Sequence, residues 1–491
     1  MNRRIRWLGA FVLLCFLGLF VQLNHIQVFQ AHALATSPSN PRVAQASRNN
    51  PLGIIVSSNG TVLAESVPSP AGNYYRYHRS YPTGSLFAQI VGYDSIIYGT
   101  TTGVESYYRN YLVPYSVPAP KVSLHNLSTL FDKTGSATNT LRLTVSVALQ
   151  QLAATELGSR TGAVVAIDPS TGAILAMYSN PSFDPNPLAS PGTKTENAAW
   201  ASYESNPSQP MLQRAWRRSY PPGSTFKVIT TSAVYDKDPS VATKNFPAVS
   251  QIALPGTSHL LHNYAYEVCG GTMAQMLPPS CDTGYSLIGL ALGPGNLEAE
   301  ASAFGIGRQV PLDINPPPAI SSIASLSYLE SVPSYVAFSA IGQGNDQMTA
   351  LQMALVAGGI ANDGTIMRPH VLDNVRDATG RIVDTYQPAS WLHATSPVTA
   401  SQVTGLMTQV AQHGTAAGLF SPSWDVAAKT GTAQIGQHGL TTDWMIGFAP
   451  ANAPKVALAV VVPRQAPGAT GASEAGPIMA AMFNAIFGGT S

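Results

Sequence analysis

The most informative part of this sequence is Tyr220-Pro221-Pro222-Gly223-Ser224-Thr225-Phe226-Lys227-Val228-Ile229. The two prolines and the glycine predict a turn, and the apolar residues after it predict a helix. Ser224 then begins the helix and Lys227 lies one turn later on the same face. A serine hydroxyl becomes a good nucleophile when a nearby base, such as a neutral lysine, takes its proton. The stretch therefore predicts an activated serine, with helix N-terminal N–H groups available for an oxyanion.

A second motif, Lys429-Thr430-Gly431-Thr432-Ala433, follows an apolar run and predicts an edge strand. Strand alternation places Thr430 and Thr432 on one face and Lys429 on the other, and Gly431 lets a substrate backbone approach closely. Such a strand can bind an extended peptide by strand addition and offer hydroxyls and an ammonium to its terminal carboxylate. The similar triplet Lys133-Thr134-Gly135 lies in a polar segment without a flanking strand, and we assign it no role.

A third motif, Ser280-Cys281-Asp282-Thr283, lies between the other two. A serine here can relay protons between the lysine and a leaving group. The alternative interpretation is an ordinary loop or helix cap, which an isolated match of this kind would favour.

The order Ser-x-x-Lys, Ser-x-Asp, Lys-Thr-Gly resembles that of the penicillin-binding proteins, a family of active-site serine acyltransferases whose middle motif normally reads Ser-x-Asn. The stretch around Ser224 is similar to the nucleophile helix of the family almost residue for residue. Further similar segments are residues 340–344, 349–353, 362–365, 368–369 and 444–450. Upstream, Asn59-Gly60, Leu63-Ala64, Gly92-Tyr93 and Gly103-Val104-Glu105 resemble the pedestal of the class B members. The order of anchor, pedestal and catalytic domain resembles that of class B, specifically the short division-type, penicillin-binding protein A-like members seen in actinobacteria.

The resemblance implies a D,D-transpeptidase that cross-links peptidoglycan stem peptides. Ser224 would attack a donor stem ending in D-Ala-D-Ala and release the last D-Ala, and an amine of a second stem would then deacylate it. Lys227 would be the acylation base and Ser280 the proton relay. β-Lactams would acylate Ser224 as donor mimics, and no cofactor is implied.

The resemblance also assigns the binding groups. Lys429, Thr430 and Thr432 would hold the donor carboxylate, with Gly431 between them. The backbone N–H groups of Ser224 and Thr432 would bind the oxyanion.

Asp282 departs from the pattern, because an ionised carboxylate cannot donate the hydrogen bond that an asparagine amide supplies. It also places a negative charge near Lys227, which opposes the neutral form that a lysine base requires. Two hypotheses follow. Either transpeptidation is weakened or lost, or Asp282 is protonated in use and donates as an asparagine would.

The N-terminus predicts export of the rest of the chain. Arg3, Arg4 and Arg6 precede an apolar run over residues 7–21, and basic residues before such a run are typical of the cytoplasmic side. The run is short for a membrane span, but a helix over residues 7–26 can reach across. The alternative is a cleavable signal peptide, because Ala33-Leu34-Ala35 resembles a small-x-small cleavage site.

The domain prediction has five parts: a cytoplasmic tail (1–6), a membrane anchor (7–26), a linker (27–50), a small β-rich pedestal (51–141) and a transpeptidase domain (142–491). Apolar patterns predict a helix over residues 145–157, strands over 162–167, 173–178, 444–448 and 456–462, and a closing helix over 476–487. Together with the resemblance, they imply an α+β transpeptidase fold. It consists of an antiparallel sheet flanked by helices, a helical subdomain, an N-terminal anchor helix and the pedestal.

The cysteines suit an exported chain. Cys269 and Cys281 can form a disulfide in an oxidising compartment, or they can remain two unpaired thiols. His259 and His262 have HxxH spacing but no evident third ligand, so we expect no metal site.

The composition excludes several classes of protein. Of 491 residues only 10 % are charged, against about 25 % in an average soluble domain. A net charge of +1 gives no basic excess for nucleic acid, and the hydrophobic content of 45 % excludes a disordered chain. A surface with few ionisable groups gains little net charge as pH falls, and this property suits an acidic medium.

Three other functions remain to be weighed. A β-lactamase shares the three motifs, but the chain has a pedestal and no evident acidic residue to activate a deacylating water. A D,D-carboxypeptidase differs only in using water as acceptor. A weakened or non-catalytic scaffold or a β-lactam sensor is consistent with Asp282. The resemblance also implies that the pedestal contacts a membrane glycan polymerase.

Overall fold

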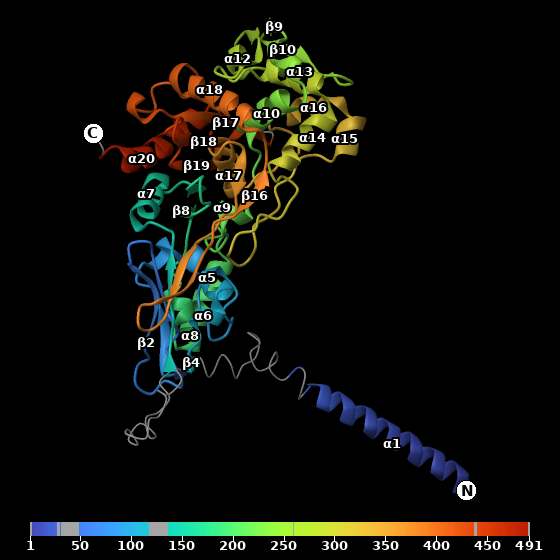
Figure 1. Ribbon diagram of the computed structural model, residues 1–491, viewed down its shortest axis with the longest axis vertical. Helices are drawn as coiled ribbons and strands as arrows, with labels where there is room; N and C mark the ends of the chain where they lie inside the picture. The colour runs from blue at the N-terminus through green and yellow to red at the C-terminus, as the bar shows by residue number, and fades with distance from the viewer. Residues whose placement is uncertain are drawn as a thin grey trace.

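The computed structural model of the chain describes residues 2–26, 30, 49–116, 136–258, 260–436 and 439–489. Figure 1 shows an N-terminal part built around β2 and a larger part that ends in α20. His259 and the triplet Lys133-Thr134-Gly135 lie outside the described residues, as does most of the predicted linker.

The N-terminal part is a six-stranded sheet in the order β15-β14-β6-β1-β2-β3. Asn59-Gly60 forms the predicted hairpin turn, and Gly60 has a φ of +87°, which glycine adopts without strain. β1 pairs in parallel with β6, and β6 pairs antiparallel with β14, a strand from much later in the chain. The strands are β1 (Ile54–Val56), β2 (Val62–Pro68), β3 (Tyr77–Ser80), β6 (Thr140–Leu143), β14 (Leu372–Arg376) and β15 (Ile382–Thr385). Beside them lie η2 (Gly84–Leu86), α4 (Ala88–Val91), α5 (Gly103–Tyr107), α6 (Arg109–Leu112) and the strand pair β4 (Tyr115–Ser116) and β5 (Ser136–Ala137).

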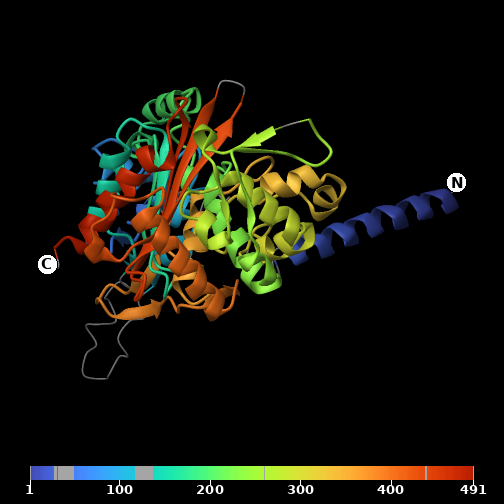
Figure 2. The same cartoon turned by 90° about the horizontal axis from the view of Figure 1, so that it is seen from above.

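The larger part is built on an antiparallel five-stranded sheet in the order β17-β18-β19-β7-β8. Its strands come from both ends of the larger part, as the sequence predicts. Every residue of β7 is buried, because helices cover both faces of the sheet (Figure 2). The strands are β7 (Gly162–Ile167), β8 (Ile174–Asn180), β17 (Ala427–Ile435), β18 (Leu440–Ala449) and β19 (Val456–Gln465).

α7 (Val147–Leu157) and α20 (Gly476–Phe487) pack together on one side of this sheet, and α17 (Ala350–Ala361) packs on the other. α17 is apolar and buried on all sides, as expected of a helix enclosed by a core. Gly358 lets it approach β7, since a Cβ there would lie 2.8 Å from Ile167 Cδ1. The helices predicted over 145–157 and 476–487 are confirmed.

A helical insert carries most of the remaining elements. The helices between β8 and β17 are η4 (Asn186–Ala189), α8 (Thr193–Glu204), α9 (Arg214–Arg217), η5 (Gly223–Phe226), α10 (Lys227–Lys237), α11 (Ser240–Thr243), η6 (Tyr264–Tyr266), α12 (Met273–Met276), α13 (Asp282–Leu292), α14 (Pro294–Ala303), α15 (Leu326–Ser331), α16 (Pro333–Ser339), α18 (Pro397–His413) and η7 (Pro422–Trp424). The short helix α19 (Gly471–Glu474) follows β19 instead. Short strand pairs join them: β9 (Phe246–Val249) with β12 (Cys269–Gly271), β10 (Gln251–Ala253) with β11 (Leu260–His262), and β13 (Thr365–Met367) with β16 (Ser390–His393). The apolar patterns did not predict these short strands.

The N-terminal helix is α1 (Asn2–Asn24). Within the described residues, its segment Arg6–Asn24 is the one helix long and apolar enough to cross a membrane. A signal sequence would have the same length and composition, so the helix leaves both interpretations of the N-terminus open.

Candidate active site

Ser224 lies in η5, a tight turn held between two neighbours. Trp444 of β18 donates from Nε1 to the carbonyl oxygen of Pro221 at 2.8 Å, and the N–H of Gly223 donates to the carbonyl oxygen of Gly342 at 2.9 Å. Gly223 has a φ of +53°, which explains the glycine at this position. The predicted turn and helix are present, but Ser224 lies in the 3-10 turn η5, and the α-helix α10 begins at Lys227 rather than at Ser224.

Lys227 is fully buried and its ammonium has three acceptors. Nζ donates to Asp282 Oδ1 at 2.6 Å, to the carbonyl oxygen of Ser280 at 2.7 Å and to Ser280 Oγ at 3.3 Å. Burial lowers the pKa of Lys227, and the carboxylate of Asp282 acts in the opposite direction. The charge that the sequence placed near Lys227 is therefore in direct contact with it.

Ser280 joins the two lysines. Lys429 Nζ donates to Ser280 Oγ at 2.8 Å and to the carbonyl oxygen of Thr430 at 2.9 Å. Burial, together with the nearby charge of Lys227, lowers the pKa of Lys429 well below its usual range. Ser280 has a φ of +61°, a strained value for a residue with a side chain, and such strain is common at functional sites.

Asp282 is the first residue of α13, and its Oδ1 accepts two hydrogen bonds. One comes from Lys227 and the other from Ser224 Oγ at 3.3 Å. In the described part of the chain, the Ser224 hydroxyl makes no hydrogen bond to Lys227. Asp282 thus lies between the residue predicted as nucleophile and the residue predicted as its base.

Two further contacts fix the motif loop. Cys269 and Cys281 form a disulfide with an S–S distance of 2.09 Å, so that alternative of the sequence analysis is confirmed. Asn263 is buried; its Oδ1 accepts from the N–H of Thr283 at 2.8 Å, and its Nδ2 donates to the carbonyl oxygens of Val249 and Glu267. Sequence reasoning missed Asn263, because a lone asparagine in a loop carries no pattern.

β17 is the edge strand of the large sheet, as predicted for Lys429-Thr430-Gly431-Thr432. The Thr430 hydroxyl lies 2.6 Å from that of Thr415, and Thr432 Oγ1 accepts from the N–H of Gly471 at 3.0 Å. A Cβ on Gly431 would lie 2.7 Å from the carbonyl oxygen of Pro222. This glycine therefore lets the turn that carries Ser224 pack against β17.

A buried carboxyl group lies next to β17, on the adjacent strand β18. Asp443 of β18 is the cross-strand partner of Thr432, and its Oδ2 accepts from the Thr441 hydroxyl at 2.9 Å. The pKa of Asp443 is raised to about 6: burial is the main cause and Glu474 adds to it, whereas hydrogen bonds from the hydroxyls of Thr441 and Thr432 act in the opposite direction. Sequence reasoning missed Asp443, which sits in an otherwise ordinary buried strand.

Several residues of the three motifs line one cleft of about 820 Å³. They are Ser224, Ser280, Asp282, Thr430 and Thr432, and aromatic side chains such as Tyr264 and Tyr335 lie beside them. Within the described residues, no cluster of three or more His, Cys, Asp or Glu side chains could hold a metal ion. The chemistry that the cleft can support is nucleophilic attack by a serine with proton transfer among fixed side chains.

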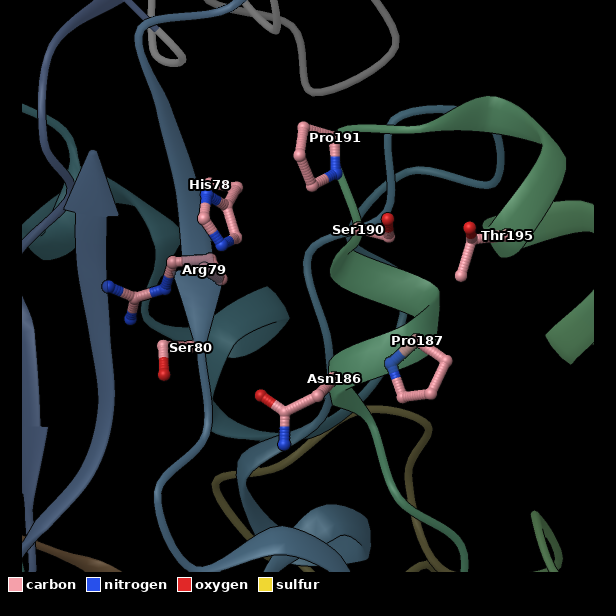
Figure 3. A pocket seen from close by; sticks show the side chains of 8 residues that line it. All are labelled: His78, Arg79, Ser80, Asn186, Pro187, Ser190, Pro191 and Thr195. Atoms are coloured by element: carbon pink, nitrogen blue, oxygen red, sulfur yellow. The ribbon is translucent and has the colours of Figure 1, made fainter. Parts of the chain in front are cut away.

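A second cavity of about 270 Å³ lies between β3 and the segment that carries η4 (Figure 3). In that view the Arg79 side chain points away from the cavity, and its Nε donates to Glu105 Oε1 at 2.5 Å. None of the predicted site residues lines this cavity, so the large cleft is the candidate active site.

Comparisons with known proteins agree with this geometry. Residues 162–486 match the family model described as penicillin binding protein transpeptidase domain. Residues 53–135 match the model described as penicillin binding protein A dimerisation domain.

The chain is similar over its length to curated proteins of mycobacteria. It is 34 % identical over 480 residues to peptidoglycan D,D-transpeptidase PbpA of Mycolicibacterium smegmatis, covering 94 % of each chain. It is 33 % identical to the PbpA of Mycobacterium tuberculosis, covering 100 % of both.

Solved structures show the same likeness. The ceftriaxone acyl-enzyme complex of M. tuberculosis penicillin-binding protein A superposes with a TM-score of 0.79 at 30 % identity, covering 90 % of this chain and 100 % of that one. A crystal structure of the same protein gives a TM-score of 0.78 at 32 % identity, covering 89 % and 99 %. The α+β fold class expected from the sequence is thereby confirmed.

Proposed function

This chain belongs to the penicillin-binding protein transpeptidase family and is a peptidoglycan D,D-transpeptidase, and we propose that Ser224 is the nucleophile that both stem peptides and β-lactams acylate. The observation that carries this assignment is that Ser224 and Ser280 line one cleft and that the buried Lys227 and Lys429 lie directly behind them, both hydrogen-bonded to Ser280. Ser224 and Lys227 are hydrogen-bonded to Asp282. Lys227 and Lys429 are hydrogen-bonded to the hydroxyl of Ser280.

The donor stem peptide would bind along the free edge of β17 by strand addition. Its terminal carboxylate would be held by the hydroxyls of Thr430 and Thr432, with the ammonium of Lys429 behind them. Ser224 would attack the carbonyl carbon of the penultimate D-Ala. The N–H groups of Ser224 and Thr432 would bind the oxyanion, the charge that develops in the transition state.

Ser280 is suited to protonate the leaving group. Its Oγ accepts from Lys429 at 2.8 Å and from Lys227 at 3.3 Å, so its own proton is free to point into the cleft. Ser280 would give that proton to the departing D-Ala nitrogen and recover one from the neighbouring ammonium groups. An amine of a second stem would then attack the acyl-enzyme and complete the cross-link.

The domain assignment of the sequence analysis is part of this proposal. α1 would anchor the chain as a single span at residues 7–26, with the tail (1–6) in the cytoplasm and the linker (27–50), pedestal (51–141) and transpeptidase domain (142–491) outside. The Cys269–Cys281 disulfide supports an oxidising location for the catalytic part. The pedestal would contact a membrane glycan polymerase, and co-purification of the full-length chain with such a polymerase is its test.

Intact-mass measurement after benzylpenicillin tests the nucleophile. We expect one covalent adduct on the wild type and none on Ser224→Ala, because that variant lacks the hydroxyl that opens the lactam ring. Product analysis with a stem-peptide donor and an amine acceptor should give a cross-linked dimer. An adduct that persists on Ser224→Ala would contradict the assignment, and exclusive hydrolysis of the donor would point to a carboxypeptidase.

A further inference from the structure

We propose that the hairpin of β10 and β11 binds the acceptor stem peptide, and that Glu267 holds the amine of that peptide in its ammonium form. This inference rests on the proposed function, which gives the donor stem a place on β17 and the acceptor none. The hairpin projects from the helical insert (Figure 2). We use the name acceptor wall for residues 260–267, of which residues 260–264 and Glu267 line the same cleft as Ser224.

The donor strand and the acceptor wall belong to different sides of the cleft. β17 contributes Thr430, Thr432 and Gln434 to the lining, and a stem peptide added to its edge covers that side. The acceptor wall is attached elsewhere, because β11 packs against α13. A peptide bound along β17 therefore leaves the acceptor wall open to a second peptide within the same cleft.

The acceptor wall is fixed to the loop that carries the Ser280 motif. Asn263 is buried; its Oδ1 accepts from the N–H of Thr283 at 2.8 Å, and its Nδ2 donates to the carbonyl oxygen of Glu267 at 2.8 Å. Two residues after Glu267, the disulfide ties Cys269 to Cys281. The backbone of Glu267 is therefore held in place beside the catalytic motif before any acceptor arrives.

Large apolar side chains are exposed in this segment. Leu260, Tyr264, Tyr266 and Val268 have 49 %, 57 %, 61 % and 69 % of their surface exposed. Exposed apolar groups gathered at one place are typical of a binding surface. Ala265 and Tyr266 have φ values of +49° and +58°, a strained conformation of the kind found at ligand sites. Such a surface suits the methylene chain of an aliphatic amine.

The charges at the surface of the cleft favour a cation. Among the described residues that line it there is no lysine or arginine, since Lys227 and Lys429 are buried. The carboxyl and imidazole groups that do line it are Asp282, Glu267 and His262. Lys227 compensates the charge of Asp282 at 2.6 Å, whereas no ion pair within the described residues includes Glu267. An incoming cation thus meets an uncompensated carboxylate at Glu267.

The acceptor supplies that cation. A primary aliphatic amine has a pKa of about 10.4, as a lysine side chain does, so it reaches the cleft as an ammonium group. Glu267 attracts this form and raises its concentration beside the acyl-enzyme. The covalent step is unchanged: the amine loses its extra proton to water and attacks the acyl carbon of Ser224. The C–N bond forms, the ester C–O bond breaks, and Ser224 Oγ recovers the second proton of the amine.

Transfer kinetics test the role of Glu267. The donor is a thioester analogue of the stem peptide, and the acceptor is a lysine-containing tripeptide with a blocked N-terminus. We expect Glu267→Gln to lower kcat/KM for this acceptor by about three- to tenfold, mainly through a higher KM, and the loss to shrink at high salt. Glu267→Lys should lower it by more than about tenfold. Glu330→Gln is the matched control, because it removes an exposed carboxylate that does not line the cleft.

A second acceptor separates charge from shape. Replacing the lysine amine by an aminooxy group gives a nucleophile that is uncharged at neutral pH, and Glu267→Gln should not change its KM. Equal losses with the two acceptors, or a KM for the lysine acceptor equal to that of Glu330→Gln, would overturn the proposal. So would a loss in benzylpenicillin acylation as large as the loss in transfer, because acylation needs no acceptor. A wild type that forms no adduct with benzylpenicillin would instead contradict the proposed function itself.

Discussion

Two carboxyl groups, Asp282 and Asp443, lie beside residues of the catalytic motifs. Asp282 is hydrogen-bonded to Ser224 and Lys227. Asp443 is the cross-strand neighbour of Thr432 and is fully buried. The raised pKa of Asp443, about 6, means that its folded form holds a proton to higher pH than the unfolded chain does. Its contribution to stability is therefore complete below pH ~4, the unfolded value, and is lost as pH rises through about 6.

Asp443→Asn should remove this dependence. At pH 7.5 we expect the variant to be more stable than the wild type by about 2 kcal/mol after allowance for solvent screening, because no buried carboxylate must be ionised. At pH 4 the two proteins should be equally stable. Urea unfolding at both pH values measures the difference, with the exposed Glu330→Gln as a control that should change neither value. Equal effects of Asp443→Asn at pH 4 and 7.5 would contradict the expectation.

At this scale, the sequence predicted the residues that belong to contiguous motifs. Ser224, Lys227, Ser280, Lys429 and both threonines of β17 could be found because each motif brings its members together locally. Asn263, Asp443 and Gly471 could not be found, since each reaches its partner across a fold-dependent contact. The contact of Asp282 with Lys227 was predicted, but its hydrogen bond from Ser224 was not.

Among the elements, the contact between β17 and η5 sets the position of the nucleophile. A glycine at position 431 leaves room for Pro222 and Thr225, whose atoms lie 2.7–3.1 Å from where a Cβ would stand. A Cβ atom at these distances would clash with Pro222 and Thr225, so a side chain at position 431 must displace the turn that carries Ser224.

Gly431→Ala should therefore slow benzylpenicillin acylation by about 100-fold or more and destabilise the fold by about 1–3 kcal/mol. Stopped-flow acylation and urea unfolding measure the two effects. Gly405→Ala in α18 is the matched control, because nothing lies within 4 Å of its Cβ position. That change should leave acylation unaltered and stabilise the helix by up to about 1 kcal/mol. Normal acylation by Gly431→Ala would show that the turn does not depend on this contact.

Long elements were predictable and short ones were not. β19 has ten residues and α20 has twelve, and most of them are apolar, so their periodicity or continuity stands out. β10, β11 and β12 have three residues each, too few for a pattern. β12 is tied by the disulfide of Cys269, and β10 and β11 pair with each other. The pairing of β14 with β6 joins segments that no local signal connects.

The molecule as a whole has few charged residues and several buried carboxyl groups. Burial raises the pKa of Glu300 and Asp313, and it raises that of Asp346 well above its usual range. Each group acts as Asp443 does, favouring the folded state in acid and losing that contribution as pH rises. The pKa values of the partly exposed His78, of the buried His370 and of Lys429 are lowered by burial, and these groups act in the opposite direction.

We expect the carboxyl groups to dominate, so that the free energy of unfolding is larger at pH 5 than at pH 7.5. The difference should amount to about 2–4 kcal/mol, the scale of one to three ionisations of buried groups. Denaturant titrations from pH 3 to 8 measure it, and Asp346→Asn should reduce the difference. A stability maximum at neutral pH with collapse by pH 4 would contradict the expectation and the inferred suitability for acidic media.

The place of β14 in the N-terminal sheet has a consequence for the order in which the chain can fold. In the proposed topology, in which the chain after α1 crosses the membrane in sequence order, β1, β2, β3 and β6 emerge well before Leu372 follows. Until then one side of β6 has no strand beside it and offers its backbone N–H and C=O groups to any other extended chain. In that topology the early sheet is an unfinished intermediate that needs protection from aggregation while more than half of the polypeptide has still to cross the membrane.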